Sequence, residues 1–472
     1  MPDRARRKQM KRITCIFLVV CLCLNLAGCS SEGGKEDEGH VLSEKEWQEE
    51  ALEKAGKCLK KLTLEEKIGQ MFVVDADKLM EGNEPVTDFS PEFLKMIEQY
   101  KIGGIVFGSQ NICDAGQMKS LIAKIHESEG MGKSISIPLY IGTEEEGGGE
   151  NSIAVHSDTI TSTGYISPSE MGTNMTETQL EDTGKIIASE LLELGFNMNF
   201  APTADVVEPE RLANMQAVSD SVEAVVGERP VYHAPSKKAS RAKRKKSQKE
   251  YEKSVQEYDA KYDAFLQKYT EDKYKQSCFG DDKDKVGEAV EAMVKGMHGA
   301  GEAGICTALK YFPGISSVAR YHKLADTEIE TGLSRLRRVN LAPFADGIDA
   351  GTDFIVVSHV SLGKVDKGMP SSLSRTIMTE LLRSEMGFEG ILITEQMDVP
   401  VITNQYSTEQ AVIRAIVSGA DIIYNPENLE EAISAVERAV MFGEIDEKRI
   451  NQTVLRILQN KILRNIYLEN AG

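Results

Sequence analysis

The stretch Gly390-Ile391-Leu392-Ile393-Thr394-Glu395-Gln396-Met397-Asp398 (GILITEQMD) is an apolar run that ends abruptly in polar and acidic residues. An unbroken run of aliphatic residues after a glycine predicts a strand buried on both faces, as in a parallel sheet. Glu395 lies at the end of this strand, at the edge where parallel sheets carry their functional side chains. We therefore consider Glu395 a candidate functional carboxylate, with a solvated loop acid as the alternative.

Short apolar runs like this one recur along the chain and alternate with longer amphipathic stretches. The eight predicted strands are residues 72–75, 103–109, 137–143, 196–202, 305–312, 353–359, 390–396 and 421–425. Helical patterns lie at 92–100, 117–126, 180–194, 286–298, 377–386 and 408–418, and a final amphipathic helix is predicted at 447–466. This alternation is typical of an α/β fold of the (β/α)8 TIM-barrel type. A doubly wound open sheet produces the same alternation, and the number of strands does not exclude it.

The first 28 residues combine a basic start with an apolar stretch too short to span a membrane, which is typical of an export signal. The end of this segment, Leu26-Ala27-Gly28-Cys29, resembles the bacterial lipobox. The resemblance implies lipid attachment at Cys29 and a lipoprotein anchored to the outer face of the cell membrane. A plain signal peptide with an incidental cysteine is the alternative. Residues 29–59 are then a tether and a leading helix.

A long segment, residues 208–276, interrupts the alternation where a barrel loop needs far fewer residues. It predicts a charged helical hairpin inserted after the fourth strand. One helix carries an aromatic stripe at helical spacing, formed by Tyr251, Val255, Tyr258, Tyr262, Phe265 and Tyr269. The basic run at 237–246 is a solvated face or, alternatively, a contact with anionic envelope polymer or lipid headgroups.

Composition narrows the class of protein further. With 41% hydrophobic and 27% charged residues, the chain of 472 residues is expected to fold. The formal net charge of −19 argues against nucleic acid as a partner. Cys58, Cys113, Cys278 and Cys306 have no metal-ligand spacing, so we expect buried thiols, with one disulfide left open. No phosphate loop, zinc spacing or nicotinamide fingerprint occurs, so we expect neither a cofactor nor a metal.

Several ordered blocks carry a resemblance to a known family. They read LTLEEKIGQMFVV, KIGGIVFGSQN, IPLYIGTEEEGGG, LGFNMNFAPTADV, KYFPG, PSSLS, MGFEGILITEQMD and RINQTVLRILQNKI. The chain resembles glycoside hydrolase family 3, in its single-domain β-N-acetylhexosaminidase-like branch. The resemblance covers residues 60–466 apart from the insertion. It implies a single barrel domain and a retaining glycosidase that acts on a carbohydrate substrate.

The resemblance also implies roles for particular residues. Glu395 takes the place of the family's nucleophilic Asp. The acid/base His of the family is at best His322, displaced by one position. Substrate-binding positions correspond to Glu144 in place of an Asp, Lys310 as in the family, and Tyr311 in place of a His.

One further position keeps the family pattern, and several others depart from it. His359 matches the family His after strand six and is counted as substrate-binding. Gly149 and Gln276 stand where the family has arginines. The partners of the catalytic His become Ser317 and Arg320.

These substitutions leave two hypotheses from different classes. The first is an envelope-anchored retaining glycosidase of altered specificity or weakened activity. The second is a non-catalytic, sugar-binding or scaffolding lipoprotein that kept the barrel. The first predicts that Glu395 and an acid/base group approach to about 5–5.5 Å across one pocket, as retaining chemistry requires.

Overall fold

The computed structural model describes residues 43–130, 133–148, 166–207, 274–314, 328–329 and 331–467, and short helical pieces between residues 245 and 261. The predicted signal peptide, Cys29 and nearly all of the predicted hairpin lie outside the described residues. The chain has two compact units that meet at Glu46, and the unit from Trp47 onward contains the barrel.

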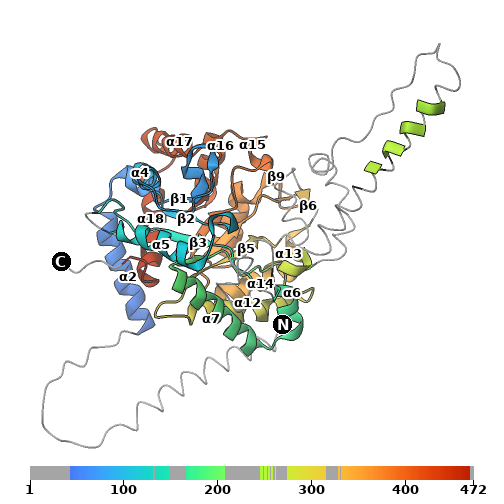
Figure 1. Ribbon diagram of the computed structural model, residues 1–472, viewed down its shortest axis with the longest axis horizontal. Helices are drawn as coiled ribbons and strands as arrows, with labels where there is room; N and C mark the ends of the chain where they lie inside the picture. Colours follow the sequence, from blue (N-terminus) through green and yellow to red (C-terminus); the bar gives the residue numbers. More distant parts are fainter. Residues whose placement is uncertain are drawn as a thin grey trace, which may run out of the picture. The chain divides into compact units, whose positions relative to one another are not determined.

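Eight parallel strands form the centre of this unit (Figure 1). In chain order they are β1 (Phe72–Asp75), β2 (Gly104–Val106), β3 (Tyr140–Thr143), β4 (Met198–Asn199), β5 (Cys306–Phe312), β7 (Phe354–Val357), β10 (Ile391–Thr394) and β11 (Ile423–Tyr424). Each lies within a strand predicted from the sequence. A parallel bridge between Ile393 and Ile422 joins the two edge strands, so the ring closes. Closure confirms the (β/α)8 barrel and excludes the doubly wound open sheet.

Helices surround this sheet and connect its strands (Figure 1). The α-helices are α2 (Glu44–Leu59), α3 (Leu64–Gly69), α4 (Pro91–Tyr100), α5 (Ala115–Glu127), α6 (Pro168–Asn174), α7 (Glu177–Leu194), α11 (Tyr274–Ser277), α12 (Lys283–His298), α13 (Leu333–Arg338), α14 (Leu341–Asp349), α15 (Pro400–Thr403), α16 (Thr408–Ser418), α17 (Leu429–Met441) and α18 (Glu447–Leu463). The helix predicted at 377–386 is a π-helix, η9 (Thr376–Glu385).

Shorter elements complete the described structure. Four 3-10 turns are η1 (Ala76–Leu79), η2 (Glu81–Asn83), η3 (Ser109–Asn111) and η8 (Ser371–Leu373). A small second sheet contains β6 (Glu328–Ile329), β8 (Ser361–Leu362) and β9 (Asp366–Pro370).

Helix α7 shows how local sequence sets the ends of these helices. Thr176 and Gln179 form a reciprocal capping box, in which each side chain accepts a hydrogen bond from the other residue's backbone N–H. The helix ends at Gly195, whose φ of 98° a residue with a side chain rarely adopts. Its apolar face is buried, including Leu180, Ile187 and Leu191.

Alternate strand residues separate two apolar layers. Residues such as Val73, Ala308 and Ile391 form a cluster inside the barrel, whereas Leu392 packs in the larger cluster between the sheet and the helices. Because successive side chains of a strand point to opposite faces, the residues two positions beyond an interior residue also face inward. This alternation places Glu395, two positions beyond the interior residue Ile393, inside the carboxyl end of the barrel.

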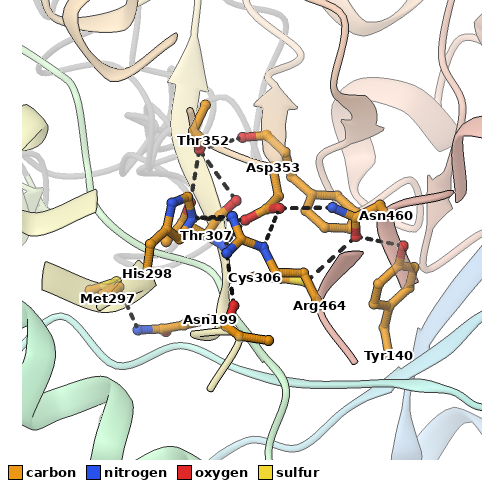
Figure 2. A network of polar contacts seen from close by, with 12 residues as sticks. Tyr140, Asn199, Met297, His298, Cys306, Thr307, Thr352, Asp353, Asn460 and Arg464 are labelled. Atoms are coloured by element: carbon orange, nitrogen blue, oxygen red, sulfur yellow. Dashed lines mark hydrogen bonds and ion pairs between the residues drawn. The ribbon is translucent and has the colours of Figure 1, made fainter. Parts of the chain in front are cut away.

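The opposite end of the barrel is closed by α18 through a buried carboxylate, Asp353 (Figure 2). Its Oδ1 accepts hydrogen bonds from Asn460 Nδ2 and Arg464 Nε, each at 2.8 Å. Its Oδ2 accepts one from the backbone of Thr307 at 3.0 Å. Burial alone would raise the pKa of the Asp353 carboxyl, but Arg464 and His298 hold it well below its usual range.

A second buried carboxylate, Asp421, lies just before β11 and binds the same helix. Arg449 and Arg456 of α18 and Arg383 of η9 all form ion pairs with it, and Arg456 Nη1 lies 2.8 Å from its Oδ1. The three guanidinium groups also donate to backbone carbonyl groups. Helix α18 is therefore tied to the amino ends of β7 and β11.

Lys461, also on α18, is fully buried. Its Nζ donates to Gln70 Oε1 (2.8 Å), the Gly103 carbonyl (3.0 Å) and the Pro138 carbonyl (2.7 Å). The amine lies 4.6 Å from the centroid of the Tyr140 ring. Burial among these neutral acceptors lowers the pKa of Lys461 to about 7.

The contacts of Asp353 predict that substitution of Arg464 lowers the free energy of unfolding more than substitution of an arginine in an exposed ion pair. Arg464→Met would leave a buried carboxylate short of its cation, so we expect a loss of about 3–5 kcal/mol in the free energy of unfolding. The matched control is Arg438→Met, which breaks an exposed pair with Glu409 and should cost at most about 1 kcal/mol. Urea unfolding measures both, and equal losses would contradict the anchoring role of Asp353.

Candidate active site

A cavity of about 60 Å³ lies at the carboxyl ends of the strands, inside the ring. The apolar side chains of its lining belong to inward-facing residues on a strand or directly after one. Most of the charged and amide side chains belong to residues just beyond the end of a strand. The described residues that line it are Val106, Glu144, Phe200, Lys310, Tyr311, Val356, Glu395, Gln396 and Tyr424. Glu395, Glu144, Lys310 and Tyr311, all singled out from the sequence, therefore meet in one pocket.

Glu395 is held at the end of β10 by its backbone. Its N–H donates to the Val357 carbonyl of β7 at 2.9 Å, which extends the pairing of the two strands. The side chain is 3% exposed and faces the cavity. A buried carboxylate at the centre of a barrel pocket is suited to act on a bound substrate.

Lys310 is the cation of the described lining. Its Nζ forms an ion pair with Glu144 and a second with Glu146 Oε2 at 3.2 Å. Glu146 is itself held by Thr203, whose backbone N–H and hydroxyl both donate to Glu146 Oε1. Burial alone would lower the pKa of Lys310, but the two carboxylates raise it, so this group remains an ammonium ion.

The glycines after these glutamates let the chain turn tightly at the pocket rim. Gly147 and Gly148 have φ angles of 84° and 58°. A Cβ at Gly148 would lie 2.4 Å from the Ser167 backbone nitrogen, so a side chain does not fit there. Glu145 closes the turn by accepting a hydrogen bond from the Gly147 N–H at 2.9 Å.

His359 is fully buried behind the pocket. Its Nε2 lies 2.7 Å from the Gln396 carbonyl, and its Nδ1 lies 2.6 Å from the Ser372 hydroxyl. Since a carbonyl can only accept, Nε2 carries a proton and donates it. His359 thus orients the peptide between Gln396 and Met397, one residue beyond Glu395. The substrate-binding role of His359 stays a prediction.

The remaining sequence candidates are less informative. His322, Ser317, Arg320 and Gly149 lie outside the described residues, so the separation between Glu395 and an acid/base group stays a prediction. Asp398 forms an ion pair with Lys78 at 2.8 Å and is not part of the cavity lining.

Other expectations concerned cysteines and metals. Of the described cysteines, Cys58, Cys278 and Cys306 are buried, as expected, whereas Cys113 is exposed, and the expectation of burial was wrong there. Within the described ranges, no cluster of His, Cys, Asp and Glu side chains has the geometry to hold a metal ion.

Sequence reasoning missed two aromatic side chains of the pocket. Phe200 and Tyr424 stack with ring centroids 5.4 Å apart and an interplanar angle of 27°. Both lie on the interior side of predicted strands, so the strand alternation could have found them. The Tyr424 hydroxyl donates to Asp75 Oδ1 at 2.6 Å, a contact between the first and last strands that the sequence does not reveal.

The fold and this pocket define a (β/α)8 barrel with carboxylates and a lysine gathered at its carboxyl end. A family model described as the glycosyl hydrolase family 3 N terminal domain matches residues 63–227 and 268–460. The chain therefore belongs to glycosyl hydrolase family 3. The model passes over residues 228–267, which lie inside the predicted insertion.

Individual relatives are more distant. The chain is 23% identical over 437 residues to beta-hexosaminidase A of Pseudoalteromonas piscicida, covering 85% of this chain but 61% of that protein. A beta-hexosaminidase of Idiomarina loihiensis is 22% identical over 372 residues, covering 78% of this chain and 90% of that protein. A beta-hexosaminidase of Xylella fastidiosa is 32% identical over 165 residues, covering 34% of this chain and 47% of that protein.

Solved structures support the same fold. A family 3 beta-N-acetylglucosaminidase from Paenibacillus sp. superposes with a TM-score of 0.63 at 23% identity, covering 87% of this chain and 64% of that one. A beta-N-acetylhexosaminidase from Beutenbergia cavernae gives a TM-score of 0.62 at 20% identity, covering 85% of this chain and 98% of that one.

The two ion pairs of Lys310 predict that Lys310→Met destabilises the fold. Glu144 and Glu146 would face each other without a cation, so we expect a loss of about 3–5 kcal/mol. The raised pKa of Lys310 means that the stabilisation is fully present below the ordinary lysine pKa of about 10.4 and is lost as the pH rises through the folded-state value. Lys78→Met, which removes a partly exposed pair with Asp398, is the control. Unfolding curves from pH 7 to 11 that coincide for the two variants would refute this account.

Proposed function

We propose that the chain hydrolyses O-glycosyl bonds as a retaining glycosidase of the β-N-acetylhexosaminidase type. The observation that carries this proposal is the placement of Glu395, whose carboxylate faces the central pocket of a family 3 barrel beside Lys310 and Glu144. The names of the relatives support an N-acetylated amino sugar as the substrate class.

The mechanism has two steps, the formation of a covalent glycosyl-enzyme and its hydrolysis. A carboxylate oxygen of Glu395 attacks the anomeric carbon and forms a covalent glycosyl-enzyme, while the bond to the leaving oxygen breaks and an acid donates a proton to that oxygen. In the second step, water attacks the same carbon, its proton passes to the conjugate base, and Glu395 is released. We propose His322 as the acid/base group. Lys310, Glu144 and Tyr311 would bind hydroxyl groups of the sugar.

We further propose that activity is weak or that its specificity differs from that of the relatives. Glutamate is longer than the family's aspartate by one C–C bond, about 1.5 Å. An attacking group misplaced by about 1 Å can lose on the order of a hundredfold in rate. Glu395 must therefore meet a sugar that is seated differently in the pocket.

A non-catalytic, sugar-binding role is the second candidate. The observation that favours it is the pairing of Lys310 with both Glu144 and Glu146, which uses the ammonium group inside the protein. In that case the pocket would bind a sugar through Glu144 and the aromatic side chains without attack by Glu395.

Substitution of Glu395 separates the two candidates. For the glycosidase, Glu395→Gln should lower turnover of 4-nitrophenyl N-acetyl-β-glucosaminide by at least about a thousandfold, because an amide is a very poor nucleophile. Glu395→Asp tests the side-chain length, and the exposed Glu409→Gln is the control. Turnover that survives in the Gln variant would eliminate Glu395 as nucleophile. Absence of turnover by the unmodified protein and by all three variants, with N-acetylglucosamine still bound, would favour the non-catalytic candidate.

We also propose that the protein is exported and anchored to the outer face of a bacterial membrane through lipid on Cys29. The lipobox-like sequence Leu26–Cys29 supports this proposal. Among the described helices, none is both long and apolar enough to cross a membrane. The basic run of the insertion would contact anionic envelope polymer.

Lipid attachment is tested by metabolic labelling with an alkyne-bearing palmitate in a bacterial host. We expect label on the full chain and none on the Cys29→Ser variant, which loses the thiol that would carry the lipid. Cys113→Ser, which removes an exposed cysteine of the barrel, is the control and should keep the label. Equal labelling of the Cys29→Ser variant would exclude this residue as the attachment site.

A further inference from the structure

Behind the pocket, Asp75 and Tyr424 form a pair that joins the first and last strands of the barrel. The Tyr424 hydroxyl donates to Asp75 Oδ1 at 2.6 Å, and Asn425 Nδ2 donates to Asp75 Oδ2 at 2.5 Å. The Asp75 backbone N–H donates in return to Asn425 Oδ1 at 2.7 Å. Tyr424 lines the cavity, whereas Asp75 is not part of the lining.

The hydrogen bonds indicate which protonation state this pair holds. Both carboxylate oxygens of Asp75 accept from donors, which favours the ionised form, although burial raises the pKa of this carboxyl. The phenol uses its single proton on Asp75, so its oxygen can only accept on the pocket side. The Gln396 amide lies 3.5 Å from that oxygen. Tyr424 therefore presents an electron-rich oxygen to the pocket, with an anion directly behind it.

Such an oxygen suits a developing positive charge. In glycoside hydrolysis the transition state resembles an oxocarbenium ion, with positive charge shared by the anomeric carbon and the ring oxygen. Negative groups held in place in a dry pocket stabilise such a charge without having to reorganise. The stack of Tyr424 on Phe200 fixes the phenol ring in the lining of the cavity that Glu395 also lines.

We propose that Tyr424, polarised by Asp75, stabilises positive charge on the sugar ring bound in this pocket. Tyr424 touches the substrate, and Asp75 is a positioning residue that acts through it. This inference rests on the proposed function, because it assumes that a sugar occupies the cavity. It assigns to the first and last strands a part in the reaction that is separate from the nucleophile.

A purely structural role is the competing explanation, since the same contacts tie β1 to β11. The two roles differ in their dependence on ligand charge. Loss of a structural tie would weaken every ligand alike or lower the unfolding temperature. Loss of a negative electrostatic potential in the pocket would weaken the binding of cationic ligands more than that of neutral ones.

The test compares two probes of nearly the same shape. One is a 2-acetamido piperidine iminosugar, whose ring amine can take up a proton and become a cation, and the other is the corresponding lactam, which stays neutral. Calorimetric titration gives both affinities for the full chain and for Tyr424→Phe and Asp75→Asn. Tyr424→Phe keeps the ring and its stack on Phe200, so folding should be preserved. Tyr406→Phe, outside the cavity lining, is the control.

We expect the preference for the iminosugar over the lactam to fall roughly tenfold in both pocket variants and to stay unchanged in Tyr406→Phe. Where turnover is measurable, kcat should fall in Tyr424→Phe with little change in KM. An unchanged preference in Tyr424→Phe, with the lactam still bound, would overturn this inference alone. Failure of the unmodified protein to bind either probe would overturn the proposed function as well.

Discussion

The closed ring of strands depends on two carboxylates buried beneath it. Asp353 and Asp421 lie just before β7 and β11. Asp421 pairs with Arg449 and Arg456 of α18, and Asp353 pairs with Arg464, which directly follows this helix. A buried carboxylate requires such partners because its charge is costly away from water. The last helix of the chain is thereby tied across the amino ends of the barrel, which leaves the carboxyl ends as the place where a pocket can open.

Closure also determines which side chains meet. Strand alternation sends Glu395 inward from β10 and Tyr424 inward from β11. Lys310 of β5 and Glu144, just after β3, line the same cavity. These residues are far apart in the chain, yet a ring of parallel strands brings every carboxyl end to one opening. Asp75, on β1, reaches Tyr424 because β1 and β11 are neighbours in the sheet.

The electrostatic character of the pocket follows from this convergence. In the described lining, the ammonium group of Lys310 is shared by Glu144 and Glu146, and Asp75 lies behind the phenol of Tyr424. Glu144, just after β3, and Glu395, just after β10, therefore line the site, while Asp75 reaches it only through Tyr424. Such a lining favours ligands and transition states that carry positive charge over neutral ground states. This is the common physical basis of the proposed hydrolysis and of the role inferred for Tyr424.

The sequence by itself determined the strands, most helices and the position of Glu395, because periodicity and strand-end placement are local properties. It also singled out Lys310 and Glu144, although not the ion pair between them. Only the tertiary structure decided that the sheet closes, since closure depends on the bridge between β10 and β11 and on the anchors of α18. Only the tertiary structure likewise reveals the contact of His359 with the Gln396 carbonyl and the hydrogen bond from Tyr424 to Asp75. Contacts between residues on different strands, from tens to hundreds of positions apart, are set by the geometry of the ring, which no local pattern encodes.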